Sequence, residues 1–321
     1  MLVSIITPSF NQAAYLEQTI QSVLGQDYPH LEYIIVDGGS TDGSVSIIEK
    51  YASQLAWWVS EPDQGQADAI NKGLAHVRGE IVAWLNSDDL YLPEAVSAAV
   101  EALQAGPSLG MVYGDMRAID GMGKTVNLLT YGDWGLDELM RFEIIGQPAV
   151  FLRRTALEQA GLLDVNYYCL LDHHLWLRVA ALFPIQHISQ LWAAARFHPE
   201  AKNVAQAARF GGEAYCIVEW MRSHPLLATR YSMYRRRIWA GAHRINARYL
   251  LDGGLPRPAL RSYLRSLLAY PPIALREAHR MAFAAASLFI NVGWVKEKYL
   301  YNRQRRLERE KPSSLNESSP R

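Results

Sequence analysis

Two adjacent aspartates, Asp88 and Asp89, follow an apolar run at residues 81–85 in the segment Asn86-Ser-Asp-Asp. Neighbouring carboxylates repel each other and raise each other's pKa unless a cation lies beside them. One of them could instead cap a helix that begins near Pro93, or close an Asx turn. Taken alone, the segment is compatible with a divalent-cation site and with a purely structural turn.

The first half of the chain must position these acids, and it alternates short apolar runs with helical patterns. Strands are predicted at residues 2–7, 31–36, 56–59 and 81–85, and helices at 14–24, 44–51, 66–76 and 93–103. This alternation is typical of a doubly wound, mostly parallel α/β sheet flanked by helices. Such sheets bind ligands at the carboxyl ends of their strands. Polar segments follow all four strands, at 7–11, 37–42, 61–63 and 86–89, so we expect them to line one site.

The second half of the sequence contains two regions with different secondary-structure patterns. Residues 111–198 mix strand patterns at 111–113, 148–152 and 185–188 with a helix at 172–181. Beyond residue 204 the pattern is helical and is interrupted by prolines. We predict three parts: a catalytic domain over residues 1–203, a basic amphipathic helical region over 204–311, and a disordered tail over 312–321.

The charge balance separates the same two halves of the chain. The net charge is zero, but residues 1–203 carry 11 basic against 24 acidic side chains, and residues 204–321 carry 21 against 8. An acidic half could hold a cation, and a basic half could face anions. The two cysteines, Cys169 and Cys216, show neither disulfide-framework nor zinc-ligand spacing. With no signal-peptide pattern and no apolar run of spanning length, we expect a cytoplasmic protein.

An ordered set of motifs resembles the family 2 glycosyltransferases of the GT-A fold. The set covers roughly residues 1–203. Its segments are Thr7-Pro-Ser-Phe-Asn11, Val36-Asp-Gly-Gly-Ser-Thr-Asp42, Ala69-Ile-Asn-Lys-Gly73, Gly79-Glu-Ile-Val-Ala-Trp-Leu-Asn-Ser-Asp-Asp89, Leu171-Asp172 with Leu175-Trp-Leu-Arg178, and Arg196-Phe-His198. Each segment is a weak match alone, whereas the ordered set is a strong one.

The resemblance implies roles for individual residues. Asp89 would bind Mg²⁺ or Mn²⁺ on the diphosphate of a nucleotide sugar, and His198 would approach the same ion or the diphosphate. Asp172 would act as general base on an acceptor hydroxyl, a reading favoured over a mere helix cap, although one residue can serve as both. Gln147 would stand on the acceptor side. The remaining predicted contacts with the nucleotide sugar are Thr7, Pro8, Asn11, Asp37, Asp63, Asp68, Asn71, Asn86 and Asp88.

Two departures from the family pattern affect these assignments. Gly38 follows Asp37 where relatives can have a second acid, which leaves the base contacts less defined. Leu171 precedes Asp172 where many relatives have Glu, so Asp172 lacks an acidic neighbour. His173 and His174 flank Asp172 without metal-ligand spacing, and we expect them near the mouth of the cleft.

These observations together predict an inverting, metal-dependent glycosyltransferase with a hydroxyl acceptor on a glycan or a lipid-linked glycan. A nucleotidyltransferase of the same fold and a non-catalytic sugar-nucleotide-binding or scaffold subunit are the alternatives. The basic helical half could contact the inner face of the cytoplasmic membrane or pack on the catalytic domain. No recognition motif accompanies its charge, so we expect no nucleic-acid partner.

Overall fold

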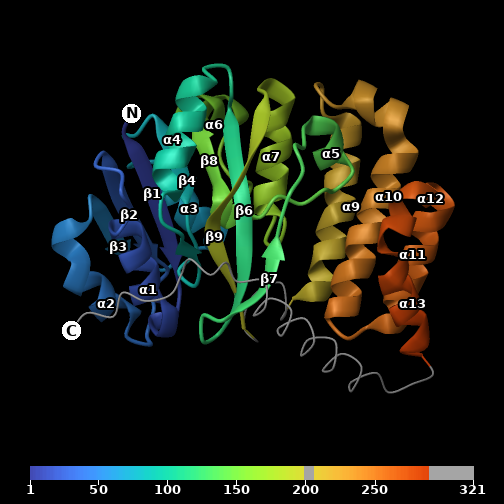
Figure 1. Cartoon of the computed structure of the whole chain (residues 1–321), viewed down its shortest axis with the longest axis horizontal. Helices are drawn as coiled ribbons and strands as arrows, with labels where there is room; N and C mark the ends of the chain where they lie inside the picture. The colour runs from blue at the N-terminus through green and yellow to red at the C-terminus, as the bar shows by residue number, and fades with distance from the viewer. Residues whose placement is uncertain (199–205, 289–321) are drawn as a thin grey trace, which may run out of the picture.

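The computed structural model describes residues 1–198 and 206–288, and the structural statements below concern these residues. Strands alternate with helices along the first range (Figure 1). The strands are β1 (Val3–Ser9), β2 (Leu31–Asp37), β3 (Trp57–Ser60), β4 (Ile81–Trp84), β5 (Leu90–Tyr91), β6 (Met111–Asp120), β7 (Thr125–Leu129), β8 (Val150–Arg153) and β9 (Ile185–Phe197). The helices are α1 (Ala13–Leu24), α2 (Ser44–Tyr51), α3 (Gln66–Leu74), α4 (Ala95–Ala105), α5 (Leu136–Met140), α6 (Arg154–Ala160) and α7 (Leu171–Leu182). All eight elements predicted before residue 106 are present, within two residues of the expected bounds.

All nine strands belong to one sheet, in the order β3-β2-β1-β4-β8-β6-β9-β5, with β7 paired to β6. β1 is parallel to both neighbours, and Val3 lies opposite Leu31 of β2 and Ile81 of β4. β3 is parallel to β2, so the carboxyl ends of four strands meet at one edge. Beyond β4 the sheet is mixed, because β8 is antiparallel to β4 and β6 while β9 is parallel to β6.

β6 and β9 are much longer than the short strands that the sequence predicts at 111–113 and 185–188. Their pairing shifts register on either side of Asp115. A Cβ on Gly114 would lie 2.5 Å from the Trp192 ring, so the glycine allows Trp192 to pack across β6. Glycine and aspartate are poor strand formers. The local pattern therefore stops at residue 113, and pairing with β9 and β7 accounts for the rest of the strand.

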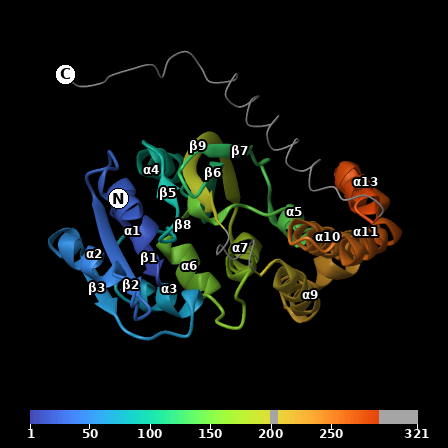
Figure 2. The same cartoon turned by 90° about the horizontal axis from the view of Figure 1, so that it is seen from below.

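The sheet separates two hydrophobic cores, because successive side chains of a strand point to opposite faces. In β1, Ile6 joins the core beneath α3, α6 and α7, whereas Val3 and Ile5 join the core beneath α1, α2 and α4. Figure 2 shows the two helical layers on either side of the sheet. This is a three-layer α/β/α arrangement with both faces of the parallel strands buried.

Helices form the rest of the described chain, as predicted: α9 (Ala207–Ser223), α10 (Ala228–Asp252), α11 (Pro256–Ala269), α12 (Pro271–Ala274) and α13 (Ala278–Ala286). They stand beside α5 and α7 (Figures 1 and 2). Phe210 of α9 and Ile245 of α10 belong to the same buried cluster as Trp176 of α7, so one core continues from the sheet into these helices. The predicted boundary at residue 203 and the tail at 312–321 lie outside the described residues.

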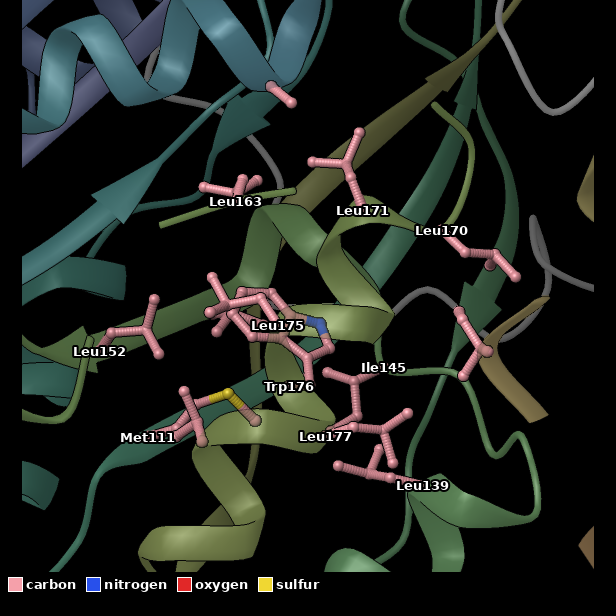
Figure 3. Close-up of a cluster of buried hydrophobic side chains, with 14 of the residues drawn as sticks. Met111, Leu139, Ile145, Leu152, Leu163, Leu170, Leu171, Leu175, Trp176 and Leu177 are labelled. Carbon is pink, nitrogen blue, oxygen red and sulfur yellow. The ribbon is translucent and has the colours of Figure 1, made fainter. Parts of the chain in front are cut away.

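The helix α7 is anchored deep in that core. Figure 3 shows its Leu175 and Trp176 among Met111 of β6 and Leu152 of β8. The Trp176 ring also stacks on Trp84 of β4, with ring centroids 5.2 Å apart. Packing on this scale holds the amino end of α7 at a fixed place beside the strand ends. None of the helices within residues 1–198 and 206–288 combines the length and apolar character that a membrane-spanning helix needs.

Candidate active site

A cleft of about 900 Å³ opens at the carboxyl ends of β1 and β4. Strand-end residues form one wall, including Pro8 near the end of β1 and Asp63 after β3. The opposite wall comes from the amino end of α7 and from α10. Of the predicted residues, the cleft is lined by Pro8, Asp63, Asn86, Asp88, Asp89, Gln147 and Asp172.

The acid pair lies in this wall in a partly desolvated state. Asp89 is buried, and its carboxylate accepts the backbone N–H of Arg196 at 2.9 Å and the side-chain amide of Asn86 at 3.2 Å. Burial raises the pKa of Asp89 well above its usual range, and the charge of Asp88 raises it further. Arg196 offsets part of this rise, but burial and the charge of Asp88 outweigh it, and a cation beside Asp89 would relieve both effects.

Arg196 fixes the loop that carries the acid pair. Its buried guanidinium donates to the carbonyl oxygens of Asp88 at 3.0 Å and Gly121 at 3.2 Å, and to the side chain of Gln18 at 2.9 Å. It also lies over the ring of Tyr15, 4.6 Å from the ring centroid. One side chain thus connects the strand end to α1 and to the hairpin between β6 and β7.

His198 reaches the acid pair from the end of β9. Its Nε2 lies 3.0 Å from an Oδ of Asp88, and its ring lies 5.1 Å from that of Tyr15. The structure thus brings His198 beside Asp88, although the histidine itself does not line the cleft. Within the described part of the chain, no three His, Cys, Asp or Glu side chains converge to hold a metal ion by themselves.

Asp172 lies on the other side of the cleft, in the first turn of α7. The N-cap position belongs to Leu170, so Asp172 is not the capping residue that the sequence left as an alternative. Its Oδ1 accepts the backbone N–H of His173 at 2.7 Å. A carboxylate at this end of a helix is stabilised by the helix dipole.

A side chain from α9 holds the segment before Asp172. The buried carboxylate of Glu213 accepts backbone N–H groups at 2.8 to 3.0 Å from Tyr168, Cys169 and Leu170. These amides belong to the turn that leads into α7, where the first N–H groups of a helix lack intrahelical partners. A helix distant in sequence therefore fixes the amino end of α7. No local motif predicts this role.

His173 and His174 do not lie at the cleft mouth, which corrects the expectation from sequence. Both are buried, and burial lowers the pKa of His173 to about 4 and that of His174 to about 3. His173 stacks on Phe142, while His174 packs between Tyr167 and Trp220 with ring centroids 4.4 Å from each. The helix turns both rings into the core because α7 is covered by protein on nearly every side.

Other predicted contacts lie outside the cleft lining and have structural partners. The buried Thr7 hydroxyl is 2.8 Å from the hydroxyl of Tyr33. Both polar atoms of the Asn71 side chain bond to the backbone of Leu163, at 2.8 and 3.0 Å. Asp68 accepts the backbone N–H of Gln64 at 3.0 Å.

The loops after β1 and β2 are also held by hydrogen bonds with predicted contact residues. Asp37 is fully buried and accepts bonds from Ser40 and from the Ser60 hydroxyl, the latter at 2.8 Å. The exposed Asn11 accepts the backbone N–H of Thr41 at 2.9 Å. These two residues shape the rim and are not among the side chains that face the cleft.

Two further predicted residues, Asp63 and Gln147, line the cleft and form hydrogen bonds with backbone groups. Burial raises the pKa of Asp63, whose carboxylate accepts the backbone N–H of Gly65 at 2.7 Å. Gln147 donates from Nε2 to the carbonyl of Trp84 at 2.7 Å, while its buried Oε1 has no hydrogen-bond partner among the described residues.

The sequence did not predict the contribution of α10. Arg244, Arg248 and Tyr249 line the cleft, although the pattern of α10 indicates only a basic amphipathic helix. Tyr131 and Trp134, after β7, also line it. The cleft therefore extends to residues beyond 203, and no local signal in the sequence could have placed them there.

Comparisons with known proteins identify the family of the chain. The family model for glycosyl transferase family 2 matches residues 4–150. An uncharacterized glycosyltransferase of Mycobacterium tuberculosis is 31% identical over 185 residues, which are 56% of this chain and 68% of that protein. The chain belongs to glycosyltransferase family 2.

Two further relatives resemble this family 2 glycosyltransferase. The putative teichuronic acid biosynthesis glycosyltransferase TuaG of Bacillus subtilis is 35% identical over 169 residues, 50% of this chain and 64% of TuaG. The structure of the mannosyltransferase PcManGT from Pyrobaculum calidifontis, in complex with GDP-Man and Mn²⁺, superposes with a TM-score of 0.58 at 20% identity. That match covers 96% of this chain and 88% of PcManGT, and it confirms the GT-A fold.

Proposed function

We propose that this glycosyltransferase moves a sugar from a nucleotide-diphosphate sugar to a hydroxyl group of a glycan or lipid-linked acceptor, with inversion at the anomeric carbon. The observation that carries the proposal is a single cleft lined by Asp88 and Asp89 on one wall and Asp172 on the other. PcManGT, which shares the fold, binds GDP-Man, and TuaG is named for polysaccharide synthesis.

In the proposed reaction Asp172 is the general base. Its carboxylate takes the proton of the acceptor hydroxyl as the hydroxyl oxygen attacks the anomeric carbon, and the bond from that carbon to the diphosphate oxygen breaks. A single displacement of this kind inverts the anomeric configuration. The first turn of α7 presents Asp172 to the cleft, and Glu213 holds the segment that leads into that turn.

The acid pair fits a divalent cation by its donor chemistry. Asp88 and Asp89 offer carboxylate oxygens, and the raised pKa of Asp89 reflects its burial beside the charge of Asp88. Mg²⁺ and Mn²⁺ bind through a few carboxylates completed by phosphate oxygens and water. A bound ion would supply neutralisation of the departing diphosphate. Arg196 would keep the two carboxylates in place.

A donor panel tests the proposal. UDP-, GDP- and dTDP-sugars are supplied with Mn²⁺ and soluble acceptor sugars. The release of the nucleoside diphosphate and the anomeric configuration of the product are followed by NMR. We expect turnover of donors with one base and a product of opposite anomeric configuration. Pyrophosphate release from a nucleoside triphosphate would indicate a nucleotidyltransferase, and binding without turnover would indicate a scaffold subunit.

We also propose that the C-terminal helices contact the inner face of the membrane. On α11, the exposed Leu264 and Leu268 stand beside the exposed Arg261 and Arg265, a combination that suits an anionic lipid surface. Co-sedimentation with vesicles tests it: binding should need phosphatidylglycerol and should weaken in Leu268→Gln. Equal recovery with purely zwitterionic vesicles would contradict the role of charge.

A further inference from the structure

The wall of the cleft formed by α10 has an aromatic surface. Tyr249 of α10 stacks on Phe210 of α9 with ring centroids 3.8 Å apart. In the segment after β7, Tyr131 and Trp134 pack edge to face with ring centroids 5.5 Å apart. All four rings line the cleft. Aromatic faces carry partial negative charge and attract the C–H edges of a sugar ring, so this wall suits a carbohydrate better than it suits a diphosphate.

Most charged groups of this wall are already paired. Arg244 lies 3.3 Å from both Glu143 and Glu277 and donates to the carbonyl of Phe142 at 2.9 Å. Asp252 pairs with Arg280 at 2.8 Å. These side chains hold α10 against its neighbours and have little charge left for a ligand.

Arg248 differs from them. It is half-buried and lines the cleft, yet no carboxylate of residues 1–198 or 206–288 lies within 4.0 Å of its guanidinium, and it makes no hydrogen bond there. Its charge acts on the cleft, because it opposes the rise in the pKa of Tyr249 that burial causes, while Asp172 adds to that rise. A half-buried cation that has no partner in the described part of the chain gains from an anionic ligand.

The donor phosphates are not the natural partner of this cation. In the proposed function they lie at the acid pair after β4, whereas Arg248 belongs to α10, and α7 stands between α10 and that part of the sheet (Figure 2). Asp172, the proposed base, lies at the amino end of α7. A group bound by Arg248 would therefore belong to the molecule whose hydroxyl approaches Asp172.

We infer that the acceptor carries a carboxylate or phosphate group, that Arg248 binds this group, and that the aromatic wall holds the sugar ring bearing it. This inference rests on the proposed function and specifies its acceptor class. It makes Arg248 a residue that determines acceptor specificity.

Binding of three small probes tests the inference. Glucose, glucuronate and glucose 6-phosphate are each titrated into the full chain in the presence of Mn²⁺ and a nucleoside diphosphate. Binding is followed by saturation-transfer NMR. We expect at least one anionic probe to bind about tenfold more tightly than glucose, the strength of one good charged contact. Arg248→Gln should abolish that preference and leave glucose binding unchanged.

The matched control is Arg235→Gln, an exposed arginine earlier on the same helix. It should keep the preference, and melting curves should show that both variants fold. Equal binding of the three probes, binding of none, or a preference that survives Arg248→Gln would overturn the inference. Weaker binding of the nucleotide diphosphate itself in Arg248→Gln would also overturn it, by assigning Arg248 to the donor. Metal-dependent nucleotide binding by the parent would still stand as support for the proposed function in each of these cases.

Discussion

The two walls of the cleft are built in different ways. The wall at the strand ends consists of short loops that each follow a strand, so its carboxylates and amides are local in sequence: Asp63 follows β3 and Asp88 follows β4. The wall at α10 consists of rings and arginines from segments far apart in the chain, such as Tyr131 and Arg248. The wall at the strand ends is therefore visible as sequence motifs, whereas the wall at α10 becomes visible only after folding.

Asp172 lines the wall opposite the acid pair and is the proposed base, so its substitution should have the largest effect. Asp172→Asn keeps the side-chain shape and removes the base, so transfer should fall by about 10² to 10⁴-fold. Binding of the nucleotide diphosphate, measured by calorimetry, should stay within a factor of about two of the parent value, because the strand-end wall is unchanged. Undiminished transfer by this variant would remove Asp172 from the chemistry.

Glu213 sharpens the comparison because it holds, from α9, the turn that carries Asp172 in the second wall. Glu213→Gln replaces a carboxylate that accepts three backbone N–H groups by an amide that accepts fewer and presents its own donors. The turn before Asp172 should loosen, and we expect kcat to fall by about tenfold with little change in donor KM. Glu219→Gln, at an exposed position on the same helix, should behave like the parent. A loss of donor binding equal to the loss of kcat would show that Glu213 acts on the whole fold.

The wall at the strand ends could be predicted from the sequence because its residues lie directly after the strands that position them. Apolar β-branched runs predict the strands, and polar residues directly after them must meet at one edge of a parallel sheet. The same reasoning failed at His173 and His174, since their burial depends on Phe142 and Trp220, which come from other elements. It also stopped at residue 113 of β6, where pairing with β9 replaces local preference.

Substitution of His174, at the contact between α7 and α9, should have the smallest effect, which concerns the pH dependence of stability. Its pKa of about 3 in the folded chain lies below the ordinary value of 6.5. Below pH 6.5 the unfolded state therefore takes up a proton that the buried ring refuses, and stability present above that pH is lost as the pH falls towards 3. His174→Phe should melt within a few degrees of the parent at pH 7.5 and show a shallower fall between pH 7 and 5. His279→Gln, at an exposed site on α13, should keep the slope of the parent, and an unchanged slope in His174→Phe would show that other groups control the acid sensitivity.

The most direct test of the account is calorimetric titration of UDP, GDP and dTDP, with and without Mn²⁺, into the parent and into Asp89→Asn. This substitution keeps an oxygen for the backbone N–H of Arg196 and removes the charge. We predict that one of the three nucleotides binds the parent only when Mn²⁺ is present. The variant should show a melting curve of a folded protein and should lose this dependence on Mn²⁺. Metal-independent binding, or equal metal-dependent binding by both proteins, would contradict the claim that the acids at the strand ends form the donor site.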